Sequence, residues 1–184
     1  IQWLRDKLGI IKNASEIEIL ANSVDNSGGL TFIPSLSGLA APYWAPSATG
    51  SLMGITRDTT NGHIARAALE AIALRCEEII IEMEKDSNKK FNNLKVDGGA
   101  SKNNLLLQIQ SDVLQCNVIR PKITETTALG AAFLAGLSTG FFKDINSLKD
   151  IWKKDRSFEP ENDPYLKKVK LLWKNRINQV LQSE

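Results

Sequence analysis

The chain has 184 residues, of which 42% are hydrophobic and 24% charged, and its formal net charge is +2. This length allows one domain with a real hydrophobic core, and so small a charge gives no indication of a nucleic-acid partner. No apolar run is long enough to cross a bilayer, so we expect no membrane insertion. Cys76 and Cys116 lie far apart in the sequence. We therefore expect them to be reduced thiols in a cytoplasmic protein.

The chain opens on a helical pattern, "IQWLRDKLG", with Ile1 as its first residue and no capping residue before it. We therefore expect the chain to be the C-terminal portion of a longer protein. A second helical segment is predicted near residues 15–24. Two short strands follow, in "GGLTFIPS" (28–35) and "SLMGIT" (51–56), separated by a loop rich in proline and small residues.

Residues 62–85 have the clearest helical periodicity of the sequence. Apolar side chains recur at intervals of three and four, which predicts one buried face. The residues predicted to face inward are Ala65, Ala68, Leu69, Ile72, Cys76, Ile79, Ile80 and Met83. The charged residues predicted to lie off this face are Arg66, Glu70, Glu77 and Glu84. We expect Thr60 or Asn61 to cap the helix.

A strand–helix–strand–helix unit is predicted over residues 94–139. It combines "LKVDGG" with a helix at 101–115, and "NVIRP" with a helix at 126–139 that ends at Gly140. Such alternation predicts crossover connections and at least one parallel strand pair. Small residues of the second helix are expected to pack closely against the sheet: Ala128, Gly130, Ala132, Ala135 and Gly136.

The tail, residues 160–184, is predicted to contain a last amphipathic helix. Its basic residues are expected to form a solvated face and not a binding patch. These residues are Lys167, Lys168, Lys170, Lys174 and Arg176.

The turn "VDGGASKNN" stands where a strand leads into a helix, the place at which open α/β folds bind ligands. Gly98 and Gly99 permit close backbone approach, and the N–H groups of the following helix suit phosphate or polar base edges. Asn103 and Asn104 can donate and accept hydrogen bonds toward a purine or ribose. The motif is neither a P-loop nor a dinucleotide fingerprint. Local sequence therefore leaves open a simple tight turn with Ser101 as the helix cap.

Three other stretches resemble the FGGY family of carbohydrate kinases. "GSLMGITRDTTNGHIARAALE" (50–70) matches the family signature, from Gly54 and Ile55 to the acid Glu70. "ETTALGAAFLAGLSTGFF" (125–142) resembles the second C-terminal helix of the family. "IPSLSGLAAPYW", together with "VDGGASKNNLLLQIQSDVL", is similar to the glycerol kinase branch.

The resemblance implies an α/β fold of the actin-like ATPase, ribonuclease-H-like class, with a mixed sheet and helices on both faces. Residues 1–184 would be the C-terminal nucleotide-binding domain, incomplete at its N-terminus, and an N-terminal domain would precede them. The implied reaction transfers the γ-phosphate of ATP to glycerol, giving glycerol 3-phosphate and ADP, with Mg²⁺ held mainly through the phosphates. A homodimer is also implied. The alternatives are another sugar kinase, of the xylulose or gluconate type, and a non-catalytic nucleotide-binding module.

Four positions match family residues that contact the nucleotide. Gly99, with Gly98 beside it, would line the adenine nucleotide, Asn103 would contact it through its amide, and Gln2 would lie near the ATP phosphates. The implied catalytic base precedes Ile1, so no catalytic residue and no metal ligand is assigned here, and the chain alone is expected to be inactive.

The sequence departs from the family at Ala45 and Thr49, which replace an acid and an arginine. These changes affect the expected rigidity of their loop and no nucleotide-contacting position.

Overall fold

The structure is a computed structural model that describes residues 1–149 and 151–182. The last two residues of the predicted 160–184 tail therefore lie outside the described part. The first half of the chain forms helices α1 (Gln2–Asp6), α2 (Glu16–Ala21) and α3 (Asn61–Ser87) and strands β1 (Thr31–Ile33) and β2 (Ser51–Met53). The second half forms β3 (Asn93–Lys95), the 3₁₀ turn η1 (Gly99–Lys102), α4 (Asn104–Leu114), β4 (Asn117–Pro121), α5 (Thr126–Ser138), α6 (Ile145–Lys149), β5 (Lys154–Phe158) and α7 (Pro164–Gln182).

The strands form two small sheets. β1 pairs with β2 in antiparallel orientation, as a short ribbon. β3 pairs with β4 in parallel, which confirms the predicted crossover, and β4 pairs with β5 in antiparallel orientation, so this second sheet is mixed. Neither β5 nor α6 was predicted, because "KDRSF" lacks the alternation of apolar and polar residues that marks a half-buried strand.

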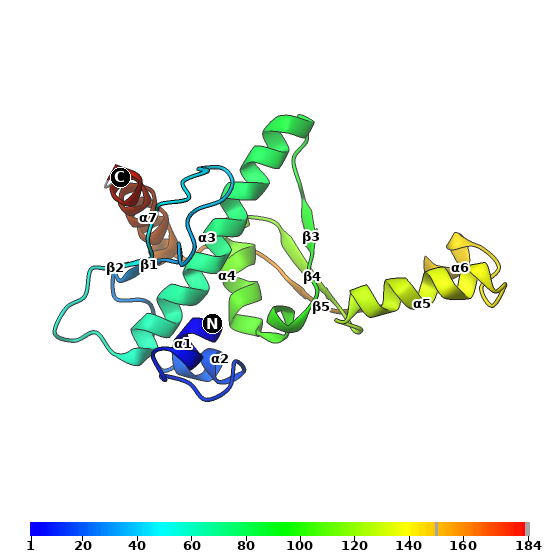
Figure 1. Cartoon of the computed structure of the whole chain (residues 1–184), viewed down its shortest axis with the longest axis horizontal. Helices are drawn as coiled ribbons and strands as arrows, with labels where there is room; N and C mark the ends of the chain where they lie inside the picture. The colour runs from blue at the N-terminus through cyan, green and yellow to red at the C-terminus, as the bar shows by residue number, and fades with distance from the viewer. Residues whose placement is uncertain (150, 183–184) are drawn as a thin grey trace.

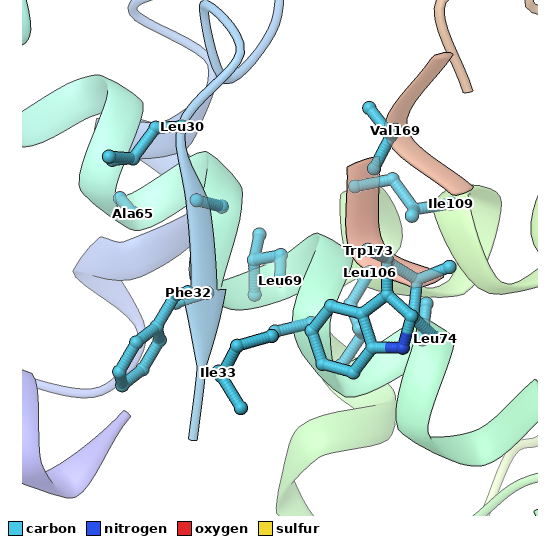
Figure 2. Close-up of a cluster of buried hydrophobic side chains, with 14 of the residues drawn as sticks. Leu30, Phe32, Ile33, Ala65, Leu69, Leu74, Leu106, Ile109, Val169 and Trp173 are labelled. Atoms are coloured by element: carbon cyan, nitrogen blue, oxygen red, sulfur yellow. The ribbon is translucent and has the colours of Figure 1, made fainter. Parts of the chain in front are cut away.

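Helix α3 runs through the centre of the molecule, with α4 packed along it and with α2 and β1 against it (Figure 1). Helix α7 packs on β1 and reaches α3 at Glu77 and Glu78. Side chains from these elements meet in one hydrophobic cluster, in which Phe32 and Ile33 of β1 lie near Leu69 of α3, and Trp173 of α7 near Leu106 of α4 (Figure 2). Burying such side chains is the main source of stability in a domain of this size. Within the described residues, no helix is both long and apolar enough to cross a membrane.

The predicted inward face of α3 is correct for its first half only. Thr60 caps the helix, as expected, since its backbone N–H donates to His63 Nδ1 and its side chain accepts from the first turn. Ile79 and Met83 were predicted to face inward, but they are 42% and 51% exposed. The last turns of α3 project beyond α4, so no element covers them there (Figure 1).

Glu70 was predicted to lie off the apolar face, but it is only 2% exposed. Around this residue nearly every position of α3 is buried, because α2, α4 and β1 surround the helix. A helix enclosed on several sides buries its polar residues together with its apolar ones.

The predicted packing of the small residues of α5 against the sheet is wrong. Helix α5 starts at the edge of the β3–β4–β5 sheet and extends away from it, with only α6 beside it (Figure 1). It contains no buried residue, and Leu134 is 71% exposed. The close approach of Gly136 is to the Phe142 ring, not to the sheet.

The predicted solvated face of α7 is only partly correct. Lys167, Lys168 and Lys174 are exposed. Lys170 instead donates to Glu77 on α3 and to the carbonyl of Val113 on α4, while Arg176 donates to three oxygens of the β1–β2 region. A basic residue on a helix that crosses other elements finds oxygen acceptors there, which sequence periodicity does not reveal.

Candidate nucleotide site

The turn after β3 has a backbone that needs glycine. Gly98 has φ +74° and ψ −179°, a region that side chains other than that of glycine rarely adopt. Its N–H donates to the carbonyl of Thr124, at 2.8 Å, which fixes the turn to the segment after β4. The tight-turn alternative expected Ser101 to cap the following helix, but the N-cap of α4 is Asn103. The Ser101 hydroxyl donates to the Gly98 carbonyl, at 2.7 Å, and so closes the turn itself.

Asn103 is the N-cap of α4. Its Oδ1 accepts a hydrogen bond from the backbone N–H of Leu106, at 2.8 Å. Because the amide oxygen is engaged in this cap, the Nδ2 group is the part of the side chain left to act toward a ligand, as a donor.

A cavity of about 380 Å³ opens beside this turn, between α2, the first half of α3 and α4. This volume is within the range of small-molecule sites. Its apolar wall consists of Ile17, Leu69, Ile72 and Leu106. Its polar rim consists of Ser15, Glu18, Lys102 and Asn103. An apolar wall with a few polar groups at one edge suits a flat heteroaromatic ring that carries a polar extension.

Gly99 lines the same cavity and leaves its backbone open. A Cβ atom placed on Gly99 would meet no protein atom within 4 Å. The Leu105 and Leu106 N–H groups at the start of α4 are already bound, to Glu18 and to Asn103. The Lys102 ammonium is therefore the group of this lining that favours an anionic part of a ligand.

Of the four predicted contact residues, the structure brings Gly99 and Asn103 together in the cavity. Gly98 shapes the turn from the adjacent position but is not among the lining residues. Gln2 is exposed on the first turn of α1, and it also is not among them, although its neighbour Ile1 is. The roles of all four toward a nucleotide stay predictions.

The described residues hold no cluster of three or more His, Cys, Asp or Glu side chains that would bind a metal ion. Asp97, before the glycines of the turn, and His63, the one histidine of the sequence, both have local partners. Asp97 accepts a short hydrogen bond from the Thr126 hydroxyl, and His63 accepts from the backbone of Thr60.

Sequence reasoning missed two residues that hold the turn in place. Glu18 of α2 accepts from the backbone N–H of Leu105, and Arg120 of β4 donates to the carbonyl of Ser101. Glu18 lies 87 positions from its partner in the sequence, and Arg120 lies 19 positions from its own, so no local pattern indicated either bond. The only hint in the sequence was that Arg120 is a charged residue within a short strand, where a charge often has a specific partner.

Residues 1–139 match the C-terminal domain of the FGGY family of carbohydrate kinases. A glycerol kinase of Dechloromonas aromatica is 54% identical over 160 residues, which cover 87% of this chain and 32% of that protein. Glycerol kinase 2 of Sulfolobus acidocaldarius is 50% identical over 182 residues, which cover 98% of this chain and 37% of that protein. The chain thus spans about a third of the length of these relatives.

Among solved structures, a Plasmodium falciparum glycerol kinase with ADP superposes with a TM-score of 0.86 at 33% identity, over 98% of this chain and 36% of that one. A gluconate kinase of Lactobacillus acidophilus has a TM-score of 0.80 at 24% identity, over 98% of this chain and 37% of that one, and shows the fold alone. The predicted actin-like, ribonuclease-H-like α/β class is confirmed by these neighbours. On the family match and these relatives together, the chain belongs to the FGGY family of carbohydrate kinases.

Proposed function

We propose that the protein is a glycerol kinase and that residues 1–184 form its C-terminal, nucleotide-binding domain. The intact enzyme transfers the γ-phosphate of ATP to a terminal hydroxyl of glycerol, which gives glycerol 3-phosphate and ADP. Identities of 54% and 50% to glycerol kinases support this substrate. In this proposal the polyol-binding groups and the general base come from the protein upstream of Ile1, and residues 1–184 contribute the adenine side of the site.

The observation that carries the proposal is the position of Gly99 and Asn103 at the polar edge of an apolar cavity. The apolar wall, which includes Leu69 and Ile72, is the surface for the adenine ring. Asn103 Nδ2 donates to an acceptor of the purine or ribose, and the open backbone of Gly99 lets the nucleotide approach.

The proposal also covers the phosphate contacts, the metal ion, the location and the oligomeric state. Gln2, beside the cavity residue Ile1, contacts the phosphate oxygens. Mg²⁺ binds mainly through the phosphates, as this ion usually does in phosphoryl-transfer enzymes. The thiols of Cys76 and Cys116 are free, which supports a cytoplasmic location, and family resemblance supports a homodimer.

The test is ATP-dependent phosphorylation by the full-length protein, with glycerol, xylulose and gluconate as separate substrates. Phosphorylation of glycerol with by far the highest kcat/KM is expected. A preference for xylulose or gluconate would assign the protein to a sister kinase. Binding of ATP without transfer to any of the three would make it a non-catalytic module.

Two variants of the full-length protein test the nucleotide site. Gly99→Val fills space that no protein atom occupies, and Asn103→Ser keeps a helix-capping oxygen but removes the amide donor. Both are expected to raise the KM for ATP by about tenfold and to leave the KM for glycerol unchanged. A tenfold change corresponds to about 1.4 kcal/mol, which is the free energy of one good hydrogen bond. Asn178→Ser, at an exposed position of α7, is the control. An unchanged ATP dependence in both variants would refute the site.

A further inference from the structure

We propose that Arg120 is a positioning residue for the nucleotide, because it holds the 3₁₀ turn that carries Gly99 and Asn103 against the sheet. This inference rests on the proposed function, since it concerns the same cavity. Arg120 itself is not among the residues that line the cavity, so its effect on a ligand passes through the turn.

The Arg120 guanidinium donates to two carbonyls of the turn and to the side chain of the first residue of α4. Nη1 lies 3.0 Å from the Ser101 carbonyl and 3.0 Å from Asn104 Oδ1, with the Lys102 carbonyl at 3.4 Å. Hydrogen bonds from a charged donor are about twice as strong as those between neutral groups. One side chain thus ties Ser101, Lys102 and Asn104, on both sides of Asn103, to strand β4.

The turn needs this external support because its own sequence supplies little stiffness. It begins with two glycines, which lose more conformational freedom on folding than other residues. A 3₁₀ segment of four residues also satisfies few of its own carbonyls. A ligand that binds a turn already held in place loses less free energy to ordering it.

A carboxylate and a ring hold the guanidinium in place. Arg120 Nε lies 2.8 Å from Asp155 Oδ2 on the neighbouring strand β5, and the guanidinium carbon lies 5.6 Å from the centre of the Phe158 ring. The side chain of Arg120 is only 14% exposed, so solvent competes little for these contacts. The Arg120 guanidinium is therefore held in one orientation toward the turn, unlike a surface charge that moves freely in solvent.

The chain offers a matched control at Arg156. This residue lies directly opposite Arg120 in the β4–β5 register, and its guanidinium carbon lies 4.7 Å from the centre of the same Phe158 ring. Within the described residues, Arg156 makes no hydrogen bond to the turn. Arg120→Gln and Arg156→Gln therefore each remove one positive charge and one contact with the same ring, and only the first also frees Asp155 and releases the turn.

The experiment measures, in the full-length protein, the Kd of the non-hydrolysable ATP analogue AMP-PNP by calorimetry, the KM for ATP and glycerol, and the melting temperature. Arg120→Gln is expected to raise the Kd and the KM for ATP by about tenfold. The KM for glycerol and the kcat at saturating ATP should stay within about twofold of wild type, Arg120→Lys should restore part of the affinity, and Arg156→Gln should match wild type.

An unchanged Kd in Arg120→Gln, equal loss for ATP and glycerol, or an equal effect of Arg156→Gln would overturn the inference. If Arg120→Gln does not fold, Asp155→Ala replaces it, because this variant removes the acceptor of Nε while it keeps the arginine. It should raise the Kd by about threefold, and an unchanged Kd would again overturn the inference. Wild-type protein that binds no AMP-PNP would refute the proposed function itself, whereas normal wild-type binding with an indifferent Arg120 refutes only the positioning role.

Discussion

The Glu18 carboxylate on α2 accepts a hydrogen bond from the backbone N–H of Leu105, at 3.1 Å, on the first turn of α4. Both Glu18 and the start of α4 border the cavity, so this bond joins two of its walls. It also places a negative charge at a helix N-terminus, where the helix dipole favours it.

We expect Glu18→Ala to lower the free energy of unfolding by about 1 kcal/mol, as the loss of a helix cap does, and to raise the KM for ATP severalfold. Glu18→Gln keeps an oxygen acceptor and should lie close to wild type in both measurements. The neighbouring Glu16, which bonds only within its own loop, provides the control variant Glu16→Ala. Equal KM values for ATP in Glu18→Ala and Glu16→Ala would contradict the role of this bond.

The two glycines of the turn are expected to respond differently to alanine. Gly98→Ala forces a side chain into a backbone region with φ +74°, so it should lower the free energy of unfolding by about 1–3 kcal/mol. Gly99→Ala meets no protein atom within 4 Å, so the stability should change by less than about 0.5 kcal/mol. Denaturant unfolding of both variants measures this difference. Equal destabilisation would mean that the turn has another backbone conformation.

Glu70 is expected to make the stability depend on pH. Burial raises the pKa of Glu70 to about 7, although Arg66, with its Nε 3.3 Å from Glu70 Oε1, acts in the opposite direction. The second oxygen, Oε2, is buried with no hydrogen-bond partner among the described residues. Because the folded state holds the proton more tightly than the unfolded one, whose pKa is near 4.5, this contribution is present below about pH 4.5 and is lost as the pH rises through 7.

Glu70→Gln removes this titration, so its stability relative to wild type should be higher at pH 8 than at pH 5. Denaturant unfolding at the two pH values measures it. The control is Glu82→Gln on the exposed part of the same helix, which should keep the wild-type pH profile. Parallel profiles for wild type and Glu70→Gln would show that Glu70 is ionised throughout.

Arg176 is expected to matter more for stability than the other basic residues of α7. Its Nη1 donates to the carbonyls of Gly29 and Met53, at 2.6 and 3.0 Å, and to Thr31 Oγ1, at 2.7 Å. Arg176→Met leaves these oxygens without their donor and should lower the free energy of unfolding by about 2 kcal/mol. Lys174 lies two positions earlier in α7 and is exposed. Lys174→Met should therefore change the free energy of unfolding by less than about 0.5 kcal/mol. Similar values for the two variants would contradict the assignment.

The features that the sequence predicts well are those set by neighbouring residues. The periodicity of α3 and the glycines of the turn are local, and both the helix and the turn form where expected. The βα alternation also predicted the parallel pair β3–β4, since few connections are possible for such a unit.

The features that the sequence did not predict depend on partners far away in the chain. Glu18 meets Leu105, and Arg120 meets Asp155 across the sheet, and neither pair leaves a local pattern. The small residues of α5 predicted close packing against the sheet, but composition does not say which element a helix surface meets. For the same reason the exposed end of α3 could not be distinguished from its buried half.

Helix α7 has a consequence for the order in which this part of the protein can be made. Its residues Leu166, Val169, Trp173, Ile177 and Val180 belong to the same core as β1 and α3. Arg176 finds its partner Gly29 147 positions earlier in the chain, and Trp173 finds Glu78 95 positions earlier. On the ribosome, β1 therefore emerges long before α7, the helix that packs on it. The part of the β1 surface that α7 buries therefore stays uncovered until α7 has been synthesised.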